Sequence, residues 1–131
     1  MMKTLEEILE RFRAMEFEEE FDLIVAIANG GIIPAAILNQ RLRLEMRLLY
    51  LGLRDDDQQL LYDSPRLLYP VDFEVKKKRV LVVDDRVNTG ATLVTAWELL
   101  TGAKYVRTFA VNGQADYSLY NEPCFPLPWN L

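Results

Sequence analysis

The sequence has 131 residues, half of them hydrophobic and 27% charged, as expected for one compact domain over residues 1–131. The net charge of −5 and the lack of any apolar run near 18 residues argue against partners such as nucleic acid or a membrane. Histidine is absent and Cys124 is the only cysteine, which excludes Ser-His-Asp and Cys-His catalysis, histidine metal sites and an intrachain disulfide, and favours a reducing cytoplasm.

Hydrophobic periodicity predicts helices and strands that alternate along the chain. In chain order we expect a helix over 5–15, a strand over 21–27, a helix over 32–42, a strand over 46–53, a strand over 80–83, a helix over 91–100 and a strand over 105–111. The first helix begins with a capping box, Thr4 and Glu7. On the last helix, helical spacing predicts that Trp97 lies in the core.

Two segments lack a clear period. Residues 55–70 are acidic and contain prolines, which predicts a long mobile loop with room for a short hairpin; such loops often close over a site. Residues 115–131 are rich in aromatic residues and proline, which predicts an irregular flap.

The order of elements predicts an α/β fold: a single domain with a mainly parallel sheet flanked by helices. In such sheets, ligands bind beyond the carboxyl ends of the strands. Two loops at that edge have a composition suited to chemistry, "ANGG" after the strand 21–27 and "DDRVNTGAT" after the strand 80–83.

The second loop predicts a site for a sugar phosphate. Thr89 and Thr92 offer hydroxyl groups, Gly90 lets the backbone approach a ligand, and the following helix adds free N–H groups. Asp84 and Asp85 directly before this loop can accept hydrogen bonds from a sugar diol or hold a hydrated Mg²⁺. A phosphate cradle beside a diol-binding acid pair fits a ribose 5-phosphate.

The first loop complements it. Its glycines, Gly30 and Gly31, lie between a buried strand and a helix and expose backbone N–H groups, which suit a second anion such as pyrophosphate. The sugar would then lie between two anion sites.

These motifs resemble a known family. "VLVVDDRVNTGATL" is similar to the phosphoribosyl pyrophosphate (PRPP) signature of the type I phosphoribosyltransferases, and "IANGGIIPAAIL" is similar to their pyrophosphate loop. The final "FPLPW" resembles the end of the bacterial xanthine-guanine and hypoxanthine members, where it forms a short hood over the purine. The resemblance implies the phosphoribosyltransferase type I fold and a homodimer.

The resemblance also implies roles for individual residues. Asp84 and Asp85 would bind the ribose hydroxyls and the metal, Mg²⁺. The remaining groups are the 5-phosphate loop Asn88, Thr89, Gly90, Ala91 and Thr92, the pyrophosphate loop Asn29, Gly30 and Gly31, and the base contacts Val111, Cys124 and Phe125.

The sequence departs from the family pattern at several of these positions. Asn88 stands where purine members have an Asp proposed as the general base, and Val111 where they have a Lys that contacts the purine. Asn29 stands where a basic residue often precedes the glycines. Arg86 replaces an apolar residue and can reach a phosphate or clamp the acid pair.

The sequence therefore predicts a phosphoribosyltransferase that transfers the phosphoribosyl group of PRPP to a nucleobase, purine first, and releases pyrophosphate. The alternative is a regulatory protein that binds PRPP or a nucleotide at the same site without turnover, and Asn88 is the residue that separates the two.

Purely structural interpretations stay open for the individual motifs. "NTGAT" can act as a plain helix cap and "NGG" as a tight turn. Trp129 can be a packed anchor or part of the hood. Response-regulator receivers also contain "VLVVDD", but there a phosphoacceptor Asp and a Lys follow on later strands, whereas only Asp116 and Glu122 are acidic after Glu98 here.

Overall fold

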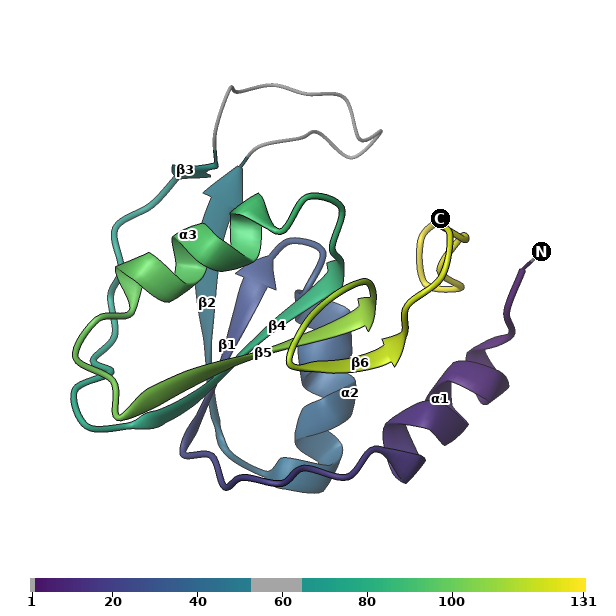
Figure 1. The fold of residues 1–131 in the computed structure, drawn as a ribbon, viewed down its shortest axis with the longest axis horizontal. Coiled ribbons are helices and arrows are strands. Elements are labelled where there is room, and N and C mark those ends of the chain that lie inside the picture. Colours follow the sequence, from purple (N-terminus) through teal and green to yellow (C-terminus); the bar gives the residue numbers. More distant parts are fainter. Residues whose placement is uncertain (1, 53–64) are drawn as a thin grey trace.

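The computed structural model describes residues 2–52 and 65–131, and in this part of the chain one sheet lies between helices on its two faces (Figure 1). The strands are β1 (Leu23–Ala28), β2 (Glu45–Gly52), β3 (Arg66–Leu67), β4 (Arg79–Arg86), β5 (Tyr105–Asn112) and β6 (Tyr117–Tyr120). The helices are α1 (Leu5–Ala14), α2 (Ile32–Leu42) and α3 (Ala91–Leu99). The predicted α/β fold with a mainly parallel sheet is confirmed.

The strands lie in the order β3-β2-β1-β4-β5-β6, and all neighbours are parallel except the antiparallel pair β2–β3. Strand β3 lies inside the predicted loop 55–70, where it forms the short hairpin with β2; residues 55–64 of that loop lie outside the described residues. Strand β6 corrects the prediction of a wholly irregular flap. It forms because Tyr117, Ser118 and Tyr120 pair with the outer edge of β5, a pairing that local composition does not reveal.

The central strands are apolar throughout because both sheet faces are covered. On β1, Ile24 and Ala26 face a core shared with α1 and α2, whereas Leu23, Val25 and Ile27 face the core under α3. Alternate side chains of the strand thus pack into two different cores, as the continuous apolar run predicted. The first core includes a stacked aromatic pair, Phe12 of α1 and Phe109 of β5, with ring centroids 5.8 Å apart.

Helix α3 packs on the sheet through Leu93, Ala96 and Leu100, which are buried. Trp97 is 57% exposed, so the prediction that it lies in the core was wrong. The reason is that residues three and four positions after Leu93 both satisfy helical spacing. The structure buries the small Ala96 against the strands, and the neighbouring indole is left at the surface.

The strand order places β1 and β4 side by side in the middle of the sheet. From β1 the chain continues through α2 to β2 on one side, and from β4 it continues through α3 to β5 on the other (Figure 1). This reversal of strand order is the place where open α/β sheets form a ligand crevice. The loops after β1 and β4 are the two that the sequence singled out.

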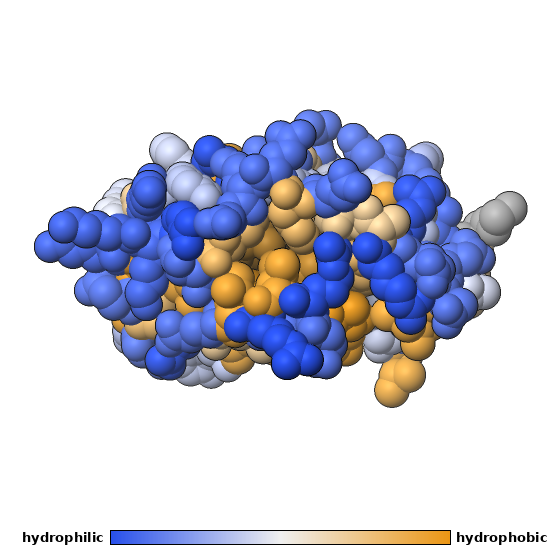
Figure 2. Space-filling view, turned by 90° about the horizontal axis from the view of Figure 1, so that it is seen from below, coloured by the Kyte–Doolittle hydropathy of each residue, from blue (hydrophilic) through white to orange (hydrophobic). Residues whose placement is uncertain are grey.

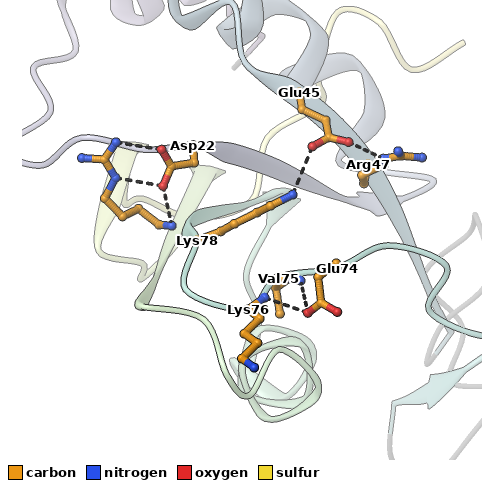
Figure 3. A network of polar contacts seen from close by, with 8 residues as sticks. Asp22, Glu45, Arg47, Glu74, Val75, Lys76 and Lys78 are labelled. Atoms are coloured by element: carbon orange, nitrogen blue, oxygen red, sulfur yellow. Dashed lines mark hydrogen bonds and ion pairs between the residues drawn. The ribbon is translucent and has the colours of Figure 1, made fainter.

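The opposite edge of the sheet is held by ion pairs between strand beginnings. Arg79 at the start of β4 donates to both carboxylate oxygens of Asp22, at 2.9 and 2.7 Å, and these hydrogen bonds hold the pKa of Asp22 well below its usual range. Figure 3 shows Lys78 reaching Glu45, at the start of β2, with an Nζ–Oε1 distance of 3.4 Å. These contacts join the amino ends of β1, β2 and β4.

The surface at the bottom of Figure 1 has apolar side chains in its middle and hydrophilic ones around them (Figure 2). A shallow hollow of about 290 Å³ is lined by the apolar Phe21, Leu42 and Leu44 and by charged residues, Glu19, Glu20 and Arg79. Among the described residues, no helix has the length and apolar character needed to cross a membrane.

The two cores allow a test of the fold. Phe109→Ala removes a fully buried ring that stacks on Phe12, so the free energy of unfolding should fall by about 3–5 kcal/mol. Trp97→Ala should cost about 1 kcal/mol or less because the indole is more than half exposed. Urea unfolding followed by circular dichroism measures both. Equal losses in the two variants would contradict the burial described here.

Candidate functional site

A cavity of about 460 Å³ opens at the carboxyl ends of β1 and β4. Most of its lining comes from three segments that are far apart in the sequence: the loop after β1, the end of β4 with the loop that follows, and residues 129–131; Leu51 of β2 also contributes. The predicted site residues in its wall are Asn29, Gly30, Asp84, Asp85, Arg86, Asn88, Thr89, Gly90, Ala91 and Thr92. The structure therefore brings the two predicted loops together around one space.

The acid pair lies at the end of β4. Asp84 is only 7% exposed, and its Oδ1 accepts a hydrogen bond from the N–H of Asp85 at 2.8 Å. Asp85 is half-buried, and its Oδ1 accepts from the N–H of Arg86 at 2.7 Å. Burial, and next the charge of Asp85, raise the pKa of Asp84 well above its usual range. The two carboxyl groups thus form a site where a cation or hydrogen-bond donors are favoured.

The loop after β1 lies directly against this acid pair. A Cβ atom added to Gly30 would lie 2.7 Å from Oδ1 and 2.8 Å from Cγ of Asp85, closer than van der Waals contact allows. A Cβ atom on Gly31 would lie 2.3 Å from the carbonyl oxygen of Val83 on β4. Gly30 therefore lets the loop touch the carboxylate, and Gly31 lets the backbones of β1 and β4 converge. The Ala28–Asn29 peptide bond before them is cis.

The loop after β4 leads into the amino end of α3. Gly90 is the residue before the helix and has φ +86°, a left-handed conformation that favours glycine. Thr89 Oγ1 accepts from the N–H of Ala91 at 3.3 Å. Because the first turn of a helix has N–H groups without helical partners and carries the positive end of its dipole, the loop Asn88–Thr92 can hold an anion.

Four predicted site residues do not line the cavity. Gly31 lies behind its wall, in contact with β4. The side chains of Val111 and Phe125 are buried in the core beneath α1 and α2, and Cys124 is exposed. Val111 and Phe125 were assigned to the base by position in the family pattern, but in this chain both are apolar and pack inward.

The last residues close one side of the cavity. Trp129, Asn130 and Leu131 line it, and Trp129 also packs against the first core, so the two alternatives that the sequence left open for this residue both stay open. The segment is held by side chains from two strand ends. Asn112 of β5 exchanges two 3.0 Å hydrogen bonds with the backbone of Glu122, and Arg86 Nη2 donates to the carbonyl oxygen of Phe125 at 3.2 Å.

Sequence reasoning missed the support beneath the phosphate loop. Gly113 follows β5 with φ +129°, and a Cβ atom there would lie 2.7 Å from both Cβ and the carbonyl oxygen of Val87. The N–H of Val87 donates to the carbonyl oxygen of Asn112 at 2.9 Å. In the sequence, this support is marked only by the dipeptide "NG" at 112–113, directly after the strand predicted over 105–111. A buried asparagine at the neighbouring strand end supports the site from behind.

A family model for the phosphoribosyl transferase domain matches residues 2–113, which contain both loops and the acid pair. The chain belongs to this family. Three curated proteins match parts of the chain. The chain is 35% identical over 89 residues to an orotate phosphoribosyltransferase of Pyrobaculum aerophilum, and 30% identical over 92 residues to a xanthine-guanine phosphoribosyltransferase of Idiomarina loihiensis.

These matches cover 68% and 70% of the chain but only 42% and 56% of the two relatives. A third, to a ribose-phosphate pyrophosphokinase of Thermococcus kodakarensis, is 50% identical over 48 residues, or 35% of the chain and 17% of that protein. The chain thus spans less than two thirds of the length of these relatives.

Solved structures confirm the phosphoribosyltransferase type I fold. A purine phosphoribosyltransferase from Pyrococcus horikoshii superposes with a TM-score of 0.81 and 25% identity, over 98% of this chain and 93% of that one. A hypoxanthine-guanine phosphoribosyltransferase from Bacillus anthracis has a TM-score of 0.71 and 19% identity, over 92% of this chain and 80% of its own, and shares the fold.

The two glycines of the first loop should respond differently to alanine. In Gly30→Ala the new methyl group meets the far end of the Asp85 side chain, which can turn away, so the fold should survive while PRPP binding is lost. In Gly31→Ala it meets main-chain oxygen, so the free energy of unfolding should fall by about 1–3 kcal/mol. Thermal melts and calorimetric titration with PRPP and Mg²⁺ separate the effects. Unchanged PRPP affinity in Gly30→Ala would refute the role of this contact.

The raised pKa of Asp84 predicts a pH-dependent stability. Between the ordinary value of 3.8 and the raised pKa, the folded protein binds more protons than the unfolded chain. Stability should therefore fall as the pH rises through this window, by up to about 1.4 kcal/mol per pH unit, and level off above it. Asp84→Asn should lack this fall and be more stable at neutral pH.

Urea unfolding of both proteins between pH 4 and pH 9 measures the difference. Asp22, whose pKa is lowered in the folded state, contributes equally to both proteins and cancels. If the free energies of unfolding of the two proteins changed with pH in parallel, ionisation of Asp84 would carry no cost in stability.

Proposed function

We propose that this chain is a magnesium-dependent phosphoribosyltransferase that transfers the phosphoribosyl group of PRPP to a nucleobase, purine first, and releases pyrophosphate. The observation that carries the proposal is the contact of Gly30 with the carboxylate of Asp85. Through this contact, the acid pair lies between the two loops that would bind anions, the loop after β1 and the loop after β4. PRPP has the same order of groups, because its ribose diol lies between a 5-phosphate and a pyrophosphate.

In this proposal the 5-phosphate lies against the loop Asn88–Thr92. Gly90 gives the loop its left-handed turn, and the hydroxyl groups of Thr89 and Thr92 add donors at the cavity wall. The dipole of α3 and its free N–H groups favour the anion. In a chain with a net charge of −5, this local cradle takes the place of a broadly basic surface.

The pyrophosphate lies against Asn29 and Gly30, which line the cavity from the β1 side. Gly31 supports this loop from behind through its close approach to β4. The N–H groups of Gly31 and Ile32 bond to the carbonyl oxygens of Ile27 and Asn29 at 2.7 and 3.1 Å, and Pro34 has no N–H, so the main-chain donors for this anion would come from Asn29, Gly30 and Ile33. The reaction then depends on orientation and on stabilisation of the leaving charge, more than on an acid or base.

The acid pair offers Mg²⁺ an open site with two carboxylates, which suits this ion better than a site closed by protein ligands. Among residues 2–52 and 65–131 no group of three or more Asp, Glu, His or Cys side chains could enclose a metal ion. Mg²⁺ prefers one or two carboxylates together with waters and phosphate oxygens of the substrate, which Asp84 and Asp85 can provide. A cation there favours the charged form of Asp84 and offsets its raised pKa. When bound, Mg²⁺ would neutralise charge on the departing pyrophosphate.

Asn88 limits the catalysis that this site can offer. It lines the cavity, but an amide cannot accept a proton at any useful pH. Assistance by a general base typically contributes about 10²–10⁴ in rate, so its lack slows an enzyme without abolishing it. The same observation favours a second candidate function, a regulatory protein that binds PRPP or a nucleotide without turnover.

We further propose that the protein acts in the cytoplasm, as its single cysteine suggests, and as a homodimer, as the family resemblance suggests. Its acidic balance supports small-molecule partners over nucleic acid or an anionic membrane.

Calorimetry and a pyrophosphate-release assay with a panel of bases test the proposal together. The wild type should bind PRPP in the presence of Mg²⁺ and bind it much more weakly after chelation of the metal. Asp85→Asn should keep the fold and lose about 100-fold in PRPP affinity, because charged hydrogen bonds to the diol and the metal are lost. Absence of PRPP binding by the wild type would refute both candidate functions.

The assay separates the enzyme from the regulatory protein. Pyrophosphate release by the wild type with any base establishes an enzyme, and Asn88→Asp should then raise the rate by about 100-fold at neutral pH. Release by Asn88→Asp alone would instead identify the native protein as a binder. Asp85→Asn serves as the inactive control in every assay.

A further inference from the structure

Arg86 is the one basic side chain among the described residues that line the cavity. Its guanidinium donates from Nη2 to the carbonyl oxygen of Phe125 at 3.2 Å, on the segment that ends in Trp129. Its Nε is buried and has no hydrogen-bond partner in the described part of the chain. A buried donor without a partner is costly, so an acceptor supplied by a ligand would be favoured at this side chain.

The contacts of Arg86 separate it from the phosphate end of the cavity. Although it follows the acid pair directly, no ion pair joins it to Asp84 or Asp85 within 4 Å in the described chain; its one side-chain bond goes to the C-terminal segment. The anion-binding groups described above are main-chain N–H groups and hydroxyls of the two loops. Arg86 and Trp129 are thus a cation and an aromatic ring in the lining of the same cavity, and Arg86 is bonded to the segment that carries Trp129.

We propose that Arg86 is the specificity-determining residue for the nucleobase, and that it selects a base with an exocyclic oxo group over one with an amino group at the same position. This inference rests on the proposed function, since it concerns the same site. The guanidinium carries only donors, so it can pair with an oxo group but not with an amino group. Val111, the residue assigned to this task by the family pattern, has no polar group and is buried in the core.

The anchoring bond explains how a long side chain can discriminate. The bond to the Phe125 carbonyl fixes one end of the planar guanidinium, so the remaining donors have a defined direction. The carbonyl itself is held because Phe125 packs edge-on against Tyr120, with ring centroids 5.4 Å apart. Arg86 therefore acts on the base directly and also keeps the hood in place.

Binding of the nucleotides IMP and AMP tests this inference without any turnover. These two possible products differ at the 6-position of the base and at the adjacent N1: IMP has an oxo group and a protonated N1, and AMP has an amino group and an unprotonated N1. Binding is followed by calorimetry and by the fluorescence of Trp129 in a Trp97→Phe background, where it is the only tryptophan. The wild type should bind IMP about 10-fold or more tightly than AMP, because an amino group leaves the charged donor unpaired.

Arg86→Leu should bring the ratio of the two affinities close to one, mainly by weakening IMP. Arg86→Lys, which keeps the charge but loses the fork, should retain part of the preference and shows that the effect is not a folding defect. The matched control is Arg41→Leu, because Arg41 also donates to a main-chain carbonyl oxygen, that of Phe12, from outside the cavity. This control should leave the ratio unchanged.

The outcomes distinguish the two proposals. If both nucleotides bind the wild type equally, or if Arg86→Leu weakens both by the same factor, Arg86 serves the phosphate or the fold and the inference is overturned while the proposed function stands. If neither nucleotide binds the wild type while its fold is intact, the inference is overturned, and PRPP binding decides separately whether the proposed function stands.

Discussion

The site depends on one close approach, that of the main chain after β1 to the carboxylate at the end of β4. It needs the strand order that makes β1 and β4 neighbours. It needs two residues without Cβ atoms, Gly30 against Asp85 and Gly31 against the carbonyl of Val83. At the other edge, ion pairs such as Asp22–Arg79 join the same two strands, so their relative position is fixed at both ends. A ligand meets two loops whose separation is already set.

This arrangement has an energetic cost that a binding function explains. Burial of Asp84 beside a second carboxyl group raises its pKa, so ionisation of this carboxyl group opposes folding. A purely structural chain would gain stability from an apolar or amide side chain at the same position. The pair is compensated only when a cation or hydroxyl donors approach it. Stability and ligand affinity are therefore coupled at this strand end.

The parts of the fold that follow from local pattern were predictable from the sequence. The apolar runs of β1 and β4 predicted strands covered on both faces, and the glycines and acids that follow them predicted the cavity wall. Trp97 was not predictable, because helical spacing allowed either Ala96 or Trp97 to face the sheet. Strand β6 forms on the edge of β5, and Phe125 turns toward Tyr120. Such outcomes depend on which surface each segment meets in the folded chain, and the composition of the segment does not contain that information.

The cavity therefore has two halves with different physical foundations. In the proposed function, the half that would bind the phosphates is made of main-chain groups whose positions follow from the sheet, so it tolerates little change. The other half rests on side chains that hold a terminal segment: Asn112 on Glu122, Arg86 on Phe125, and Lys3 on Glu122 at 2.9 Å. Exchange of a few such side chains alters this wall without disturbing the sheet. Proteins named for orotate and for xanthine-guanine both match this domain, which fits a fixed phosphate half and a variable base half.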